Sequence, residues 1–211
     1  GARVAEVIKL YREGEPPDFR TLSFTGGDYR AYPKAELPEG GSLRLLVNVG
    51  RIDPTSIDAY LDAGGYAGLR RALSLKPEEV VAEVKSSGLR GRGGAGFGAG
   101  LKWSFTQPIK GYKYIACNAD EGEPGTIKDR YIMEGDPHRV VEGVTIAGYA
   151  IGAAKAFIYL RGEYYLAHHR LTTAIRQATE RNLLGRDIQG SGFAYEIEVR
   201  SGAGSYVCGE E

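Results

Sequence analysis

The sequence lacks the residues from which most metal sites are built. It has two cysteines, Cys117 and Cys208, and neither belongs to a Cys-x-x-Cys or a mixed cysteine–histidine motif. The chain is therefore not expected to bind a metal ion or an iron–sulfur cluster through its own residues. Nothing in the sequence supports a disulfide between the two cysteines, and we expect reduced, buried thiols of the kind found in cytoplasmic proteins.

Histidine is also scarce. Of the three histidines, His138 follows a proline at an expected helix start, and His168 and His169 lie on an expected polar helix. No serine or cysteine is spaced with them as a nucleophile would be, so a catalytic triad is not indicated.

Excess charge of one sign and long apolar runs are both absent. The chain has 27 basic and 27 acidic residues, which gives no indication of a nucleic-acid partner. No apolar run approaches the roughly 20 residues of a membrane-spanning helix, so no direct membrane insertion is expected. Residues 1–15 predict an amphipathic helix over residues 2–13 and do not resemble a signal peptide with a cleavage site.

Glycine, by contrast, is abundant. Many of the 31 glycines gather in residues 88–100 and 200–209. Glycine clusters in loops indicate a backbone that comes close to a ligand. Ordinary turns and helix ends explain isolated glycines such as Gly14, Gly64 and Gly185.

Alternating strands and helices predict an α/β fold. The expected strands are residues 43–49, 112–118, 155–160 and 193–199, and the expected helices beyond the first are residues 53–64, 76–87, 137–153 and 164–183. From residue 112 onward this order predicts a Rossmann-like, mainly parallel sheet with helices on both faces. A soft boundary near residues 74–76 separates an N-terminal extension with lead-in helices (1–75) from an α/β domain (76–211).

The first segment that could carry chemistry is the glycine-rich loop. The spacing of Gly91, Gly93 and Gly96 matches the dinucleotide-binding fingerprint, but a helix precedes the loop where the fingerprint requires a strand. The loop could still bring backbone N–H groups to a phosphate or a planar ring. Positive charges and aromatic rings nearby support a ligand; these are Arg92, Lys102, Phe97, Trp103 and Phe105. A flexible connector is the alternative.

The second segment is NADEGEP, residues 118–124, which follows an expected buried strand. Its carboxylates, Asp120, Glu121 and Glu123, are suited to ribose hydroxyls or to a divalent cation. Taken alone, a solvated acidic loop is the interpretation that this segment favours most.

The third segment is SGAGSYVCGEE, residues 201–211, in which glycines surround an aromatic residue and carboxylates follow. An ordinary loop that leaves a strand is the alternative. Because packed domains seldom stop directly after an apolar segment, we expect the sequence to be a piece of a longer protein.

Read in order, these segments resemble one family. The motifs are GLRGRGGAGFGAGLKW, CNADEGEPGTIKDR, EGDPHRVVEG, FIYLRGEY and GSGFAYEIEVRSGAGSYVCGEE. They resemble the NADH-binding flavoprotein subunit of respiratory complex I and the diaphorase subunits of NAD-reducing hydrogenases and NAD-linked formate dehydrogenases. The resemblance runs from about Val47 to Glu211 and leaves the first forty or so residues without an assigned role.

The resemblance implies an FMN-binding domain in which FMN and NADH share one cavity. The residues that it implies as cofactor-binding are Gly91, Arg92, Gly93, Gly94, Phe97, Lys102, Phe105, Asn118, Asp120, Glu121, Glu123, Tyr206, Gly209, Glu210 and Glu211. Among them, Glu121 and Glu211 are implied as catalytic. Phe97 and Phe105 are implied to stack on the adenine end of NADH.

The implied activity is NADH oxidation by hydride transfer to FMN, with electrons passed on to iron–sulfur clusters. Its implied partner is a neighbouring thioredoxin-like [2Fe–2S] subunit, in the cytoplasm or at the cytoplasmic side of a membrane. The family also holds a [4Fe–4S] cluster, but its ligands lie beyond the part that matches Glu211. Two alternatives are a non-catalytic piece that binds neither cofactor stably and an acidic metal-binding module.

The chain departs from the family in its glycine-rich loop. The family usually has Pro-Thr after the loop phenylalanine, where this chain has Gly98 and Ala99. Glycine gives the loop more backbone freedom, which costs up to about 1 kcal/mol on ordering. We therefore expect this loop to be looser than in the family.

Overall fold

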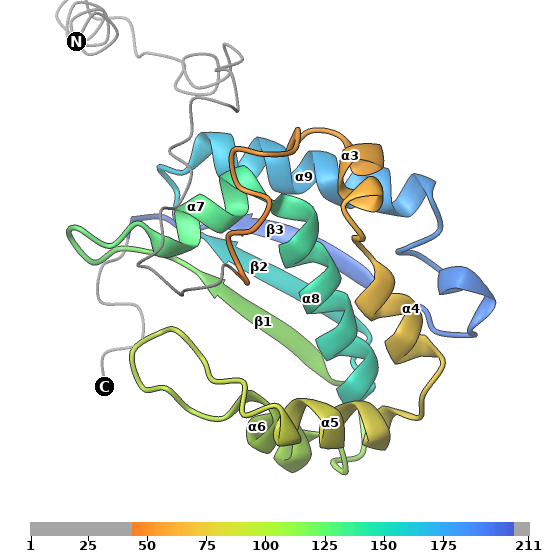
Figure 1. Cartoon of the computed structure of the whole chain (residues 1–211). Coiled ribbons are helices and arrows are strands. Elements are labelled where there is room, and N and C mark those ends of the chain that lie inside the picture. Colours follow the sequence, from red (N-terminus) through yellow and green to blue (C-terminus); the bar gives the residue numbers. More distant parts are fainter. Residues whose placement is uncertain (1–43, 205–211) are drawn as a thin grey trace, which may run out of the picture.

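The computed structural model describes residues 44–204 (Figure 1), so the helix expected at residues 2–13 lies outside the described residues. Its helices are α3 (Ile57–Asp62), α4 (Ala67–Leu73), α5 (Pro77–Ser86), α6 (Ala99–Thr106), α7 (Lys128–Gly135), α8 (Pro137–Ile151), α9 (Tyr165–Glu180) and the 3-10 helix η2 (Ile188–Gly190). Its strands are β1 (Tyr114–Ala119), β2 (Lys155–Leu160) and β3 (Glu196–Ser201). No helix within residues 44–204 is both long enough and apolar enough to cross a membrane.

The strands form a parallel sheet in the order β1-β2-β3. In its register, Cys117 of β1 lies beside Ile158 of β2, which lies beside Val199 of β3. The predicted α/β class and the parallel sheet are therefore confirmed. All three strands end at the same edge of the sheet, where ligands bind in folds of this kind.

Helices α8 and α9 pack on one face of this sheet. The side chains of Ala156, Ile158 and Leu160 are buried against them, whereas Lys155 and Tyr159 on the opposite face are half-buried. Figure 1 shows α8 lying across the sheet, with α9 packed beside it. Successive right-handed crossovers between neighbouring strands place their helices on the same side, so the expectation of helices on both faces does not hold within residues 44–204.

Local sequence signals explain the ends of the best-predicted helices. In α5, Pro77 occupies the first turn, and the backbone N–H of Lys76 donates to Oε2 of Glu79 (2.7 Å). In α8, Pro137 is the first residue, and Gly152 ends the helix with a φ of 68°. Proline tolerates the start of a helix and glycine the left-handed conformation at its end, so both helices lie close to their predicted ranges.

Several other predictions need correction. The described residues 44–50 form turns and bends where a strand was expected at 43–49. Helix α3 begins at Ile57 and is capped by Ser56, whereas a helix was expected from residue 53. Asp53 instead accepts from the backbone N–H of Thr55 (2.8 Å). Helices α4, α6 and α7 were not predicted, because they are short and lie in segments rich in glycine and charge. Strand β1, expected to be buried, forms an edge of the described sheet and alternates between exposed and half-buried residues up to Ala119, its buried last residue.

A buried carboxylate joins the helices before residue 76 to α8. Glu142 accepts from the hydroxyl of Tyr60 (2.6 Å) and from the backbone N–H groups of Tyr66 (2.9 Å) and Leu69 (3.0 Å). Nδ1 of His138 lies 2.9 Å from the hydroxyl of Tyr66. Burial lowers the pKa of His138, so this histidine serves as a neutral member of the core.

Candidate functional site

An open cleft of about 1050 Å³ lies at the carboxyl edge of the sheet. It lies between the glycine-rich loop, the ends of β1 and β2, and the start of α7. Its lining residues are Arg92, Gly93, Gly94, Ala116, Asn118, Asp120, Glu121, Gly122, Glu123, Thr126, Lys128, Asp129 and Tyr159. The structure therefore brings together the two segments that the sequence marked separately, residues 88–100 and residues 118–124.

The glycine-rich loop is closed at its base and open at its tip. The backbone N–H of Gly91 donates to the carbonyl of Phe97 (2.9 Å), and that of Ala99 donates to the carbonyl of Leu89 (2.8 Å). At the tip, a Cβ added to Gly93 or Gly94 would meet no atom within 4 Å. Gly94 has a φ of 116°, which favours glycine. The tip therefore offers bare backbone to whatever occupies the cleft.

Some residues that were predicted to bind the cofactors do not line this cleft. These are Gly91, Phe97, Lys102 and Phe105. Phe97 and Phe105 expose 49% and 60% of their surface, and Lys102 lies on the exposed side of α6. Their roles remain predictions, as do those of Tyr206, Gly209, Glu210 and Glu211, which lie outside the described residues together with Cys208.

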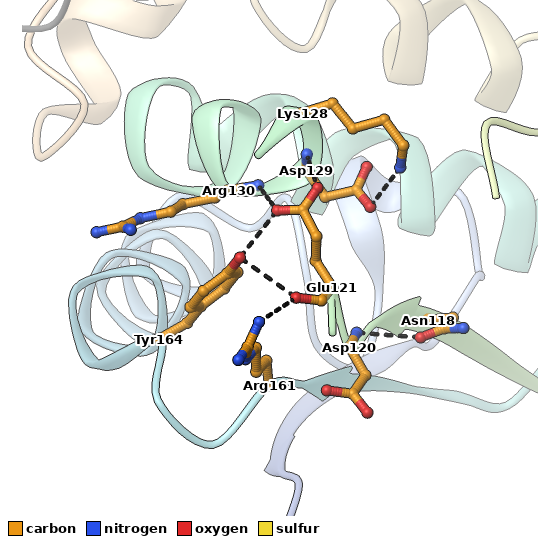
Figure 2. Close-up of polar contacts among 8 residues, drawn as sticks. All are labelled: Asn118, Asp120, Glu121, Lys128, Asp129, Arg130, Arg161 and Tyr164. Carbon is orange, nitrogen blue, oxygen red and sulfur yellow. Dashed lines mark hydrogen bonds and ion pairs between the residues drawn. The ribbon is translucent and has the colours of Figure 1, made fainter. Parts of the chain in front are cut away.

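The acidic segment is ordered by hydrogen bonds at the end of β1. The backbone N–H of Asp120 donates to Oδ1 of Asn118 (3.0 Å). Figure 2 shows the carboxylate of Glu121 reaching the start of α7, whereas the carboxylate of Asp120 points in the opposite direction. These two carboxylates therefore diverge, and no group of three metal-binding side chains is found within residues 44–204.

Glu121 is the most buried of these acids, with 4% of its surface exposed. The backbone N–H of Asp129 donates to its Oε1 (2.8 Å), and that of Arg130 donates to its Oε2 (3.1 Å). The hydroxyl of Tyr164 also donates to Oε2 (3.0 Å). Burial, together with Glu121, raises the pKa of Tyr164, so this hydroxyl stays protonated and remains a donor.

Other residues of the site were missed by the sequence analysis. Lys128 and Asp129 line the cleft and form an ion pair (2.7 Å), and Tyr159 lies on the half-buried face of β2. The outward position of Tyr159 in the alternating strand was a signal that could have identified it. Nothing local to residues 161–164 indicates that Arg161 and Tyr164 contact Glu121.

The thiol of Cys117 lies within β1 and is half-buried. Burial raises its pKa to about 11. It is therefore protonated near neutral pH and is a poor nucleophile.

Comparison with known sequences gives consistent results. Residues 84–211 match the Nuo51 FMN-binding domain family. The chain is 54% identical over 156 residues to a subunit of the NADH-quinone oxidoreductase of Aquifex aeolicus, a match that covers 74% of this chain and 37% of that protein. It is 55% identical over 179 residues to the HndC subunit of the NADP-reducing hydrogenase of Solidesulfovibrio fructosivorans, covering 84% of this chain and 36% of that protein.

Similar chains are also found among solved structures. A chain of an NAD⁺-reducing [NiFe]-hydrogenase in the air-oxidised state matches with a TM-score of 0.65 at 30% identity, covering all of this chain and 32% of that chain. A chain of an enzyme of the same description in the H₂-reduced state matches with a TM-score of 0.56 at 40% identity, covering 66% of this chain and 23% of that chain. The present chain thus spans little more than a third of the length of these curated relatives, and less of the solved chains.

Proposed function

The chain belongs to the Nuo51 FMN-binding domain family, and on this basis we propose that it forms part of a flavoprotein that oxidises NADH by hydride transfer to FMN. The cleft at the carboxyl edge of the sheet carries the proposal, because it joins the glycine-rich loop to the acidic segment. The relatives are subunits of NADH-quinone oxidoreductase and of a hydrogenase. We propose that this chain likewise works within a larger complex and passes electrons to a neighbouring iron–sulfur subunit.

The residues of the cleft fit FMN. A volume of about 1050 Å³ slightly exceeds the upper range for sites of drug-sized ligands, which leaves room for a flavin beside a nucleotide. Arg92 and Lys128 supply positive charge for a phosphate, and Gly93 and Gly94 allow close approach of the backbone. The phenol ring of Tyr159 offers a planar surface on the sheet.

The proposed reaction requires little acid–base catalysis by the protein. FMN, when bound, accepts the hydride of NADH and can release its electrons one at a time. The task of this chain is to hold the two rings at a reactive distance, which by itself removes much of the entropic barrier. Asn118 and Asp120 are placed to do this from the end of β1, whereas the catalytic roles of Glu121 and Glu211 stay predictions.

A flavin titration tests the proposal. FMN fluorescence should be quenched with one-to-one stoichiometry on addition of the 211-residue chain, and NADH should then bleach the flavin band near neutral pH. A protein that binds no FMN would contradict the proposal and would favour a non-catalytic piece.

Gly93→Val should abolish flavin binding while the fold survives. Gly93 lines the cleft, its φ is not positive, and a Cβ there meets no atom within 4 Å. Valine is therefore tolerated by the chain and excludes the ligand through its volume alone. We expect FMN affinity to fall by at least about 100-fold, roughly 3 kcal/mol, with an unchanged circular dichroism spectrum.

The matched control is Gly143→Val, which adds the same side chain to open space on α8 away from the cleft. It should bind FMN as the wild type does. Equal FMN affinity of the two variants would contradict the placement of FMN in this cleft.

NADH should reduce the flavin at least about tenfold faster than NADPH. Glu123 and Asp129 line the cleft, and like charges brought together in a partly desolvated site cost up to several kcal/mol. They would therefore repel a 2′-phosphate. The relative named as an NADP-reducing hydrogenase subunit makes the comparison informative.

The measurement is the ratio of flavin reduction rates with the two nucleotides. Glu123→Gln should bring this ratio closer to one. Equal rates of flavin reduction by NADH and NADPH in the wild type would contradict the prediction.

A further inference from the structure

Three segments meet at Glu121, and one of them lies some forty residues further along the sequence. They are the acidic segment after β1, the first turn of α7 and the loop between β2 and α9. Figure 2 shows this meeting point, with Arg161 and Tyr164 approaching Glu121 from the β2–α9 loop. Neither Arg161 nor Tyr164 lines the cleft, so any part that they play in it must be exerted through other residues.

The side chain of Glu121 fixes α7 to the acidic segment. Its two oxygens accept from the backbone N–H groups of Asp129 and Arg130, which lie in the first turn of α7. These N–H groups have no partner within a helix, and a carboxylate at this end is favoured by the helix dipole. The position of α7 therefore depends on the position of Glu121.

Arg161 and Tyr164 fix Glu121 in turn. Nη1 of Arg161 donates to the main-chain carbonyl of Glu121 (2.7 Å), and the hydroxyl of Tyr164 donates to its Oε2 (3.0 Å). The backbone N–H of Arg161 also donates to the carbonyl of Ala119 (3.2 Å). Both the main chain and the side chain of Glu121 are thus held from the β2–α9 loop.

The ring of Tyr164 is held by two guanidinium groups. The guanidinium carbon of Arg130 lies 5.4 Å from the ring centroid, and that of Arg161 lies 5.5 Å from it. Both distances are within the range of a cation–π contact. Because Arg130 belongs to α7, the same ring that donates to Glu121 also contacts the helix that Glu121 caps.

We propose that Arg161 and Tyr164 are positioning residues that hold the acidic segment and the start of α7 in place as one wall of the cleft. Lys128 and Asp129, at the start of α7, and Asp120 and Glu123, beside Glu121, all line that wall. Loosening Glu121 displaces these groups from the ligand. The consequence for FMN rests on the proposed function, whereas the consequence for α7 does not.

The test is Tyr164→Phe in the full 211-residue chain, measured by site-resolved amide hydrogen exchange and by FMN titration. Without its third donor, the Glu121 carboxylate is held less firmly. The amides of Asp129 and Arg130 should then exchange about tenfold faster than in the wild type. The dissociation constant of FMN should rise by about tenfold, which is near the lower end of the contribution of one hydrogen bond to a charged group.

The control for a lost tyrosine hydroxyl is Tyr149→Phe. Tyr149 donates to the carbonyl of Leu75 (2.7 Å), at a distance from the cleft, so its loss should leave both readouts unchanged. Arg161→Met, which keeps the length but removes the donors, should behave like Tyr164→Phe. Arg161→Lys, which keeps one donor, should restore most of the FMN affinity.

The two readouts separate the two proposals. Wild-type protein that binds no FMN would contradict the proposed function, and the amide exchange would still decide the present inference. Exchange at Asp129 and Arg130 that is the same in Tyr164→Phe as in Tyr149→Phe would overturn the inference. So would the same FMN affinity in Arg161→Met and Arg161→Lys.

Discussion

Replacing Gly100 by valine is expected to lower the free energy of unfolding by about 3 kcal/mol, at the upper end of the usual cost of overpacking. Gly100 lies in the first turn of α6 and is buried against α5. A Cβ at this position would lie 2.3 Å from the backbone nitrogen of Lys85 and 2.4 Å from its Cα. These are backbone atoms of a helix, so no side-chain rotation can relieve the overlap.

Chemical denaturation of the wild type and of Gly100→Val checks this prediction. The control is Gly98→Ala, two residues earlier, where a Cβ would lie 3.6 Å from the nearest atom, Cβ of Leu101. Its φ of −64° suits alanine, so the control should be neutral or slightly more stable. A denaturation midpoint for Gly100→Val equal to that of Gly98→Ala would show that α5 and α6 do not pack as closely as described.

The second large effect is a loss of stability as the pH rises, caused by Glu134. This side chain is 1% exposed, and burial raises its pKa to about 7, although Arg170 opposes the shift. Between the unfolded value of 4.5 and about 7, the unfolded chain releases a proton that the folded protein keeps. Stability therefore falls through this window by up to about 3 kcal/mol and then levels off.

Glu134→Gln should remove this contribution. Glutamine keeps an acceptor for Nε of Arg130, which donates to Oε1 of Glu134 (3.0 Å), and it keeps the main-chain carbonyl that accepts from Arg170. The free energy of unfolding of the variant should therefore rise relative to that of the wild type by about 2–3 kcal/mol as the pH is raised from 5 to 8. Urea denaturation of both proteins at several pH values measures the difference.

The difference between the two proteins is needed because other groups also titrate. Burial lowers the pKa of His138, so this residue favours the folded protein more as the pH rises through the unfolded value of 6.5. Its contribution is common to both proteins and cancels. A stability difference that does not change with pH would contradict the assignment to Glu134.

Strong local signals explain where the fold could be predicted. Strand β2 has the bounds expected for it, Lys155–Leu160, because alternating apolar residues lie between a helix-ending glycine and a charged loop. Helices α5 and α8 have a proline in their first turn and a glycine at or just after their end. In each of these elements the local preference and the packing agree, so the pattern alone is sufficient.

Helices α6 and α7 were not predicted from the sequence, and both omissions have the same physical cause. Helix α6 lies in a segment that glycine marks as a loop, yet Gly100 is needed there for the close approach of α5. Helix α7 begins in a polar segment, and its first turn is capped by Glu121 from outside the helix. In both cases the stabilising contact comes from a residue outside the helix, and the pattern within the helix does not contain it.

The sequence by itself determined the α/β class, the order of most elements and the two segments that form the cleft, because hydrophobic periodicity, prolines, glycines and carboxylates are local properties. The tertiary structure alone decided how these segments meet. The glycine-rich loop reaches the ends of β1 and β2, while Phe97 and Phe105 remain outside the cleft. The tertiary structure also decided that Glu121 is held by Arg161 and Tyr164, some forty residues away. Contacts of this kind depend on the parallel register, which places the ends of neighbouring strands side by side whatever their separation along the chain.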